Sequence, residues 1–270
     1  MTTKASLGVL GRRHWFELAF ALLGSLVLLL VLAPLIRITL ATPVGDLHDA
    51  AVDAEVLRSI ALTVYAAFLA TAFSAIAGIP LAYLLARKRF IGRTLLLAVI
   101  DLPIVVPHSA AGIALLTVIG RRSLIGRLFG HTLAGTVTGI SVAMAFVSLP
   151  LLVNSAREAF VAVPPRLEKA ARTLGASPAR VFFTVSLPLA WRGIVSGMIL
   201  MWARGISEFG AVVIIAYHPM VTPVMVFQRF NDFGLVAARS VAVLLILICV
   251  ALFVVLRALS RPKSEESPNA

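Results

Sequence analysis

Long apolar stretches alternate with short polar segments along the chain, and this alternation predicts its architecture. A helix that crosses the hydrocarbon core of a bilayer needs about 20 mostly apolar residues. Stretches of this length cover residues 17–41, 57–86, 94–119, 133–156, 189–217 and 235–258. The pattern therefore predicts an all-α, polytopic membrane protein with six transmembrane helices.

Composition agrees with a membrane protein. The chain has 270 residues, of which 60% are hydrophobic and only 13% are charged. A soluble domain averages about a quarter charged residues and under half apolar residues. The single cysteine, Cys249, lies within an apolar stretch, so the chain has no disulfide framework. The first apolar stretch is too long for a cleaved signal peptide, which makes it a membrane span.

Prolines interrupt the third apolar stretch. Pro103 and Pro107 lie inside it, and a proline in a span frees backbone carbonyls that must find partners in the protein or in cavity water. We therefore expect this helix to be broken near residues 107–109.

The distribution of basic residues predicts the orientation. Of the 24 lysines and arginines, 16 lie in segments on one side of the predicted spans. These residues are Lys4, Arg12, Arg13, Arg87, Lys88, Arg89, Arg93, Arg157, Arg166, Lys169, Arg172, Arg180, Arg192, Arg257, Arg261 and Lys263. The positive-inside rule then places both termini in the cytoplasm. The formal charge of +12 is explained by these basic residues in the segments that flank the spans, so it does not indicate nucleic-acid binding.

A polar segment between the fourth and fifth stretches has signals for two helices joined by a glycine. Pro165 suits the first turn of a helix, and Gly175 suits the left-handed position that ends it. Ser177-Pro178 then has the pattern of an N-cap followed by proline at the first helical position. We expect a slim helical elbow on the cytoplasmic membrane surface.

The elbow resembles the cytoplasmic loop of ATP-binding-cassette (ABC) importer permeases. That loop has the pattern Glu-Ala-Ala, three residues, Gly, nine residues, a branched apolar residue, one residue and Leu-Pro. The matching positions here are Lys169-Ala170-Ala171, Gly175, Val185 and Leu187-Pro188. Lys169 replaces the glutamate of the pattern, and the nearest acid is Glu168, one position earlier. The resemblance implies that Glu168, Lys169, Ala170, Ala171 and Gly175 dock an ATPase subunit.

The same resemblance implies a division of the chain. Residues 1–16 are a cytoplasmic N-terminus, and residues 17–56 hold the first transmembrane helix and an outer loop. Residues 57–258 form a type I ABC importer transmembrane domain with its coupling segment at 164–188, and residues 259–270 are a disordered cytoplasmic tail.

Four ionisable residues are predicted at membrane depth: Asp101, His108, Arg204 and Glu208. Arg204 lies 12 residues past Arg192, which is about 18 Å of helix and near the middle of a bilayer. Arg204 and Glu208 have the i,i+4 spacing at which opposite charges pair on a helix. Three roles are open for the group: a structural salt bridge between spans, contact with the transported species, or gating.

Enzymatic chemistry is not indicated. A phosphate-binding loop needs Gly-Lys before Ser or Thr, and the four lysines follow Thr3, Arg87, Glu168 and Pro262. The five histidines do not cluster as metal ligands, and no motif indicates a cofactor. Energy for any transport must therefore come from a partner or from an ion gradient.

Two further segments resemble the molybdate/tungstate branch of these permeases. They are Asp101 to Gly112 and Trp202 to Ala211, and Ile215 to Met220 fits the same branch. Sulfate permeases have Gly-Glu where this chain has Ser207-Glu208, so sulfate or another oxyanion is the alternative substrate. The resemblance implies a homodimer in the plasma (inner) membrane, two cytoplasmic ATP-binding subunits, and an extracytoplasmic oxyanion-binding protein.

Two alternatives come from other classes. An ion-coupled secondary transporter would use Asp101, Arg204 and Glu208 as ion sites, but it leaves the elbow without a role and is expected to have an inverted repeat, which the sequence lacks. A membrane scaffold without transport leaves the broken third span and the intramembrane charges without a purpose.

Overall fold

The computed structural model describes residues 4–123, 126–127, 130 and 132–259. The chain divides into two units, residues 1–49 and 50–270. The first unit holds the long helix α1 (Lys4–Leu40), and α2 (Val44–Val52) crosses the boundary between the units. Described side chains of α1 from Trp15 to Arg37 are exposed, which suits contact with lipid chains. The predicted tail lies outside the described residues, apart from Leu259.

The second unit contains the remaining helices, and its long ones overlap the predicted spans. They are α3 (Ala54–Arg87), α7 (Val137–Ala162), α10 (Leu187–Ile206) and α13 (Leu235–Leu259). Among the described residues, five helices, counting α1, are long and apolar enough to cross a membrane, and a bent pair of helices supplies a sixth span. The prediction of an all-α membrane protein is confirmed.

The bent pair is the third apolar stretch. It forms α4 (Arg93–Val105) and α5 (His108–Ile119), which meet at an angle of 114°. Val106 caps α4 in an extended conformation, and Pro107 is the N-cap residue that precedes α5. The predicted break is confirmed, and it lies where the residue before a proline avoids helical angles.

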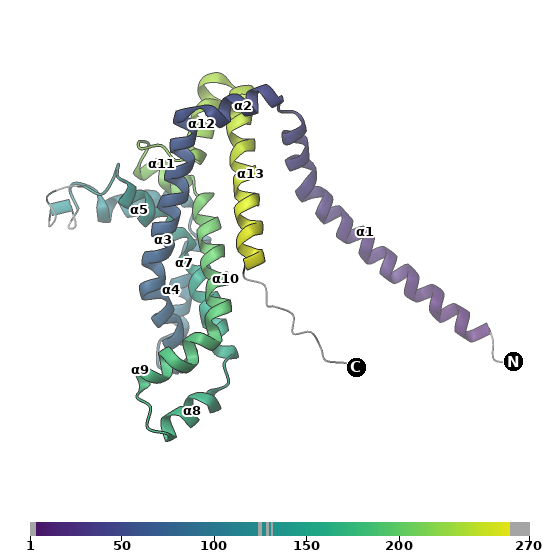
Figure 1. The fold of residues 1–270 in the computed structure, drawn as a ribbon, viewed down its shortest axis with the longest axis vertical. Helices are drawn as coiled ribbons and strands as arrows, with labels where there is room; N and C mark the ends of the chain where they lie inside the picture. Colours follow the sequence, from purple (N-terminus) through teal and green to yellow (C-terminus); the bar gives the residue numbers. More distant parts are fainter. Residues whose placement is uncertain (1–3, 124–125, 128–129, 131, 260–270) are drawn as a thin grey trace. The chain divides into compact units, whose positions relative to one another are not determined.

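The core lies where α3, α7 and α10 pack together (Figure 1). Small side chains such as Ala66, Ala67 and Ala143 are fully buried at this contact. Lipid tails are as apolar as leucine, so helices in a membrane associate through close packing of such small residues. The three packed spans therefore hold the elbow and the broken helices in position.

Two predicted spans have different boundaries in the structure. The fifth stretch is not one helix over 189–217, because α10 ends at Ile206 and a separate helix α11 (Gly210–Ile215) follows. The fourth begins at Val137 rather than residue 133, because Gly135 has a φ of +77° and the Thr136 hydroxyl caps the helix by accepting from the Gly139 N–H. The pattern also does not predict α12 (Thr222–Phe233), which is short and carries polar residues.

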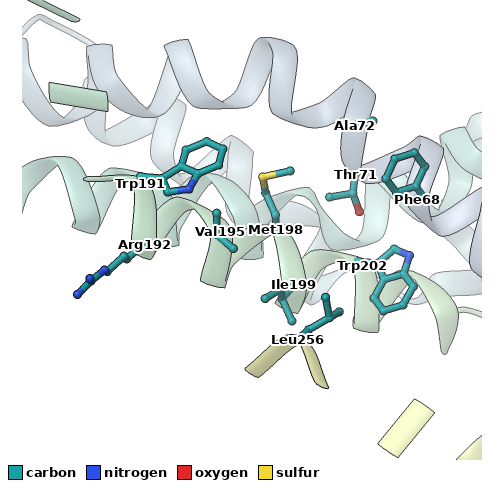
Figure 2. Close-up of a pocket in the computed structure, with 10 residues that line it drawn as sticks. All are labelled: Phe68, Thr71, Ala72, Trp191, Arg192, Val195, Met198, Ile199, Trp202 and Leu256. Atoms are coloured by element: carbon teal, nitrogen blue, oxygen red, sulfur yellow. The ribbon is translucent and has the colours of Figure 1, made fainter. Parts of the chain in front are cut away.

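A groove of about 710 Å³ opens between α3, α10 and α13 (Figure 2). Phe68 of α3, Trp191 and Trp202 of α10 and Leu256 of α13 are among its lining residues, and Arg192 lies at one end. The lining is mostly aromatic and aliphatic. Such a surface suits lipid chains or another apolar helix rather than an oxyanion.

Candidate functional site

The elbow consists of α8 (Pro165–Thr173), a turn at Gly175, and the short helix α9 (Pro178–Val181). In Figure 1 it lies at the end of the helix bundle opposite α12. Pro165 occupies the first turn of α8, as predicted. Downstream of α9, a five-residue π-helix, η1 (Phe182–Ser186), leads into α10.

The turn has the geometry that the sequence predicts. Gly175 has a φ of +86°. Its N–H donates to the Arg172 carbonyl at 2.9 Å, and the Ala176 N–H donates to the Ala171 carbonyl at 3.1 Å. These two bonds are the Schellman arrangement that ends a helix at a left-handed glycine. The Ser177 hydroxyl accepts from the Arg180 N–H at 3.2 Å and so caps the next helix.

The outer face of the elbow is open. Lys169, Ala170 and Gly175 are exposed, and Ala171 is half-buried. Leu174 is 89% exposed, so the elbow presents a large apolar side chain beside Gly175. The sequence analysis did not select Leu174, although an apolar residue beside the glycine of a polar helix was a usable signal.

Glu168 differs from the other predicted docking residues because it faces inward. Only 9% of its side chain is exposed. Its Oε1 accepts from Arg87 Nε at 2.8 Å and from the Ser186 hydroxyl at 2.7 Å. Glu168 therefore joins the elbow to the end of α3 and to the segment that leads into α10.

Three of the four predicted intramembrane charges form one cluster. Oε2 of Glu208 lies 3.0 Å from Nη2 of Arg204 and 3.0 Å from Nδ1 of His108. Arg204 Nη2 also lies 3.1 Å from both ring nitrogens of His108. Glu208 is 1% exposed, whereas the Arg204 side chain is 29% exposed. The predicted Arg204–Glu208 pairing is present in the structure.

The cluster lies where the two broken spans meet. His108 begins α5 just after the break at Pro107, and Glu208 lies in the break between α10 and α11. Oε1 of Glu208 accepts from the Ala211 N–H at 2.9 Å, which ties the carboxylate to the start of α11. The chain thus places ionisable side chains at two interruptions of its helices.

Glycines permit this meeting of α5 and α11. A Cβ added to Gly112 would lie 2.9 Å from the Ala211 carbonyl oxygen, and one added to Gly210 would lie 2.8 Å from Cβ of His108. Real Cβ atoms do not approach this closely, so both positions require glycine. The close approach brings His108 within reach of Glu208.

Asp101 is separate from the cluster. Its Oδ1 accepts a hydrogen bond from Nδ2 of Asn154 on α7 at 2.7 Å. The sequence analysis did not select Asn154, because a single polar residue in an apolar span gave no indication of its partner. Among the described residues, no three His, Cys, Asp or Glu side chains are placed to share a metal ion.

These features define a multi-pass membrane protein with broken spans around buried charges and an elbow that projects from one end. Residues 78–263 match the family described as the binding-protein-dependent transport system inner membrane component, and the chain belongs to this family. It is therefore a permease subunit, and in such transporters a separate subunit hydrolyses ATP.

Curated relatives cover almost the whole chain. It is 44% identical over 254 residues to the molybdate/tungstate transport system permease protein WtpB of Pyrococcus abyssi, covering 92% of this chain and 97% of the relative. The protein of the same name in Pyrococcus furiosus is 42% identical, with 91% and 96% covered. The sulfate transport system permease protein CysT of Salmonella typhimurium is 34% identical, with 80% and 81% covered.

Among solved structures, the chain resembles one from a bacterial ABC transporter involved in the import of the acidic polysaccharide alginate. The TM-score is 0.72 at 13% sequence identity, and the match covers 96% of this chain and 100% of that one. This likeness supports the type I ABC importer fold predicted from the elbow.

Proposed function

We propose that this chain forms the translocation pathway of an ATP-driven importer of molybdate or tungstate. Two copies of the chain form the pathway, two ATPase subunits dock on their elbows in the cytoplasm, and an extracytoplasmic binding protein delivers the oxyanion.

The observation that carries this proposal is the elbow. Its backbone is fixed by a Schellman turn at Gly175, while Ala170, Leu174 and Gly175 leave a small, partly apolar outer face exposed. A rigid apolar projection with little side-chain bulk suits insertion into a cleft on another protein. Lys169 adds a positive charge at this face, where the family pattern has a glutamate.

The position of the elbow supports its orientation toward the cytoplasm. The end of α3 lies against α8, since Arg87 contacts Glu168 at 2.8 Å. Arg87, Lys88 and Arg89 therefore belong to the same end of the bundle as Arg166, Lys169 and Arg172 of α8. A concentration of basic residues on one side of the spans is typical of the cytoplasmic face. On this basis we place both termini in the cytoplasm, with residues 57–258 as the transmembrane domain.

The substrate assignment rests on relatives and on sequence segments. The four relatives named for molybdate and tungstate are 39–44% identical to this chain, compared with 34% for the sulfate relative. Ser207 also replaces the glycine that precedes the glutamate in sulfate permeases. Sulfate is the alternative substrate, and the test below includes it.

The charge cluster is compatible with the passage of a dianion. Glu208 lies 3.0 Å from Arg204 and neutralises it, so the cluster is not an unpaired cationic site. An unpaired cation in mid-membrane would bind a dianion tightly and slow its release, since conduction requires binding that is weak enough to reverse. We therefore assign the Arg204–Glu208 pair a structural role, in which it fixes the breaks in the third and fifth spans.

The test is uptake by a reconstituted transporter. Proteoliposomes with this chain, the ATPase subunit and internal ATP are supplied with the binding protein and with molybdate or tungstate, and metal in the lumen is measured by mass spectrometry. We expect accumulation that excess sulfate does not inhibit. Uptake of sulfate in preference to molybdate and tungstate would refute the substrate assignment.

A further inference from the structure

Glu168 makes two hydrogen bonds through one buried carboxylate oxygen. Arg87 Nε and the Ser186 hydroxyl donate to Oε1 at 2.8 Å and 2.7 Å. The exposed fractions of the Arg87 and Glu168 side chains are 12% and 9%. Hydrogen bonds to a charged group are stronger than neutral ones, and burial reduces screening by solvent. This link between the elbow and the bundle is therefore a firm one.

The link reaches four elements. Glu168 belongs to α8, Arg87 is the last residue of α3, and Ser186 is the last residue of the π-helix before α10. Arg87 Nη2 also donates to the carbonyl of Val163, the residue that caps α7, at 2.9 Å. The three spans of the core are thus joined to the elbow helix at one point.

The π-helix directs Ser186 toward this point. Val181 and Ser186 are both fully buried and lie five residues apart. Residues at i and i+5 share a face in a π turn, but not in an α-helix. The buried face then continues along α10 at Ala190 and Ile194. Without the extra residue of the π turn, Val181 and Ser186 would not share a face. The Ser186 hydroxyl could then not reach Glu168 while Val181 stays in the core.

Aromatic packing holds the same junction. Tyr83 lies one turn before Arg87 on α3, and its ring centroid is 5.2 Å from that of Phe160 on α7 and 4.9 Å from that of Phe182 in the π-helix. Edge-to-face contacts of this kind add to the stability of a packed junction. The cytoplasmic ends of the three spans therefore form a rigid platform against which Glu168 is fixed.

We propose that Arg87, Glu168 and Ser186 form a strut that transmits movement of the elbow to α3, α7 and α10. This inference rests on the proposed function, because it supposes that an ATPase subunit moves the elbow. Glu168 is then a positioning residue that acts inside the chain. The ATPase contacts exposed residues of the elbow, namely Lys169 and Ala170 of α8 and Leu174 just after it.

The burial of Glu168 favours this role over direct contact with an ATPase. A docking residue must be reachable from outside, whereas the acceptor oxygen of Glu168 is already occupied by two donors of the same chain. A residue that transmits movement inside the chain has the opposite requirement, because its contacts must be internal and fixed. Loss of Glu168 should therefore leave docking intact and weaken the transfer of movement.

The experiment uses the complete transporter in proteoliposomes. Variants E168A, E168Q and S186A are compared with E158A, which removes an acid that is 74% exposed on α7. Three quantities are measured: co-purification of the ATPase subunit, ATP hydrolysis, and oxyanion taken up per ATP hydrolysed. The last ratio reports coupling and is not lowered by a smaller amount of folded protein.

We expect E168A to retain the ATPase subunit and to hydrolyse ATP, while uptake per ATP falls about tenfold, within the usual range of coupling between sites. E168Q keeps the size of the side chain and an acceptor for Ser186, so its loss should be smaller. E158A should match the wild type. The charge swap R87E/E168R should raise uptake per ATP above that of either single variant.

Two results would overturn the strut. In the first, E168A loses the ATPase subunit while its elbow remains folded, which makes Glu168 a direct contact. In the second, E168A and E168Q both keep the wild-type ratio of uptake to hydrolysis. If the E168A protein is not obtained in folded form, the ratio of uptake to ATP hydrolysis in E168Q and S186A tests the strut instead. Failure of the proposed function is distinguished by the wild type, which would then show no ATP-dependent uptake.

Discussion

Replacing Arg204 with methionine removes the cation that faces Glu208 and leaves a carboxylate that is only 1% exposed. Breaking a buried ion pair on one side costs about 3–5 kcal/mol, because the remaining charge has no partner. Here His108 still lies 3.0 Å from Oε2, and the Ala211 N–H still donates to Oε1. We therefore expect a cost near the lower limit, about 3 kcal/mol.

The reverse change should cost less. In E208Q the side chain keeps its size and can still accept from the Ala211 N–H, and Arg204 keeps its contact with His108 at 3.1 Å. We expect about 1 kcal/mol, the net value of an ordinary hydrogen bond. The double variant R204M/E208L leaves no charge buried, so it should recover more than half of the loss in R204M.

The assay is thermal unfolding of the purified protein in detergent. For a domain of this size, about 1 kcal/mol shifts Tm by roughly 2–4 °C, so R204M should fall by roughly 6–12 °C and E208Q by roughly 2–4 °C. E158Q changes an exposed acid and serves as the control, with almost no shift. If R204M is as stable as the wild type, or if the double variant is no better than R204M, the structural role of the pair is wrong.

Three further predictions concern the elbow and the outer end of α3. G175V places a β-branched residue at a φ of +86°, so it should insert in the membrane but lose co-purification with the ATPase; G175N, which tolerates this φ better, is the control, and retention by G175V would contradict docking at this turn. L174S should weaken ATPase binding about 10- to 100-fold in a pull-down titration, the value of one buried leucine, whereas unchanged affinity would exclude Leu174 from the interface. The Arg229 guanidinium, 2.8 Å from Asp53, holds the pKa of that carboxyl below its usual value; its stabilisation is therefore present above about pH 4 and is lost as the pH falls through the lowered pKa. In acid titrations followed by Tm, D53N should lose less stability than the wild type, and identical curves would refute this role.

The parts of the structure that follow from local chemistry were predictable. Pro165, Gly175 and Ser177 determine the elbow through turn and capping rules that involve only neighbouring residues. The break at Pro107 follows in the same way from the missing N–H and ring of proline. The pairing of Arg204 with Glu208 follows from a spacing of four residues.

Features that depend on distant residues were not predictable. The break at residues 207–209 contains no proline, and it is stabilised by the contact of Glu208 with His108, which lies 100 positions earlier. The inward orientation of Glu168 depends on Arg87, which is 81 residues away in the chain. The π turn at Ser186 joins two helices whose buried faces are set by packing against other spans. Each of these features is determined by tertiary contacts, which a single sequence does not display.

The source of energy is the most direct test of the central claim, because it separates an ATP-driven permease from an ion-coupled transporter. Oxyanion uptake is measured in proteoliposomes that contain this chain alone, under imposed proton and sodium gradients. The same measurement is made with the ATPase subunit, internal ATP and the binding protein present. The account predicts no accumulation by the chain alone, accumulation with all three additions, and its loss when any one is removed. Accumulation through the isolated chain under an ion gradient would contradict the account.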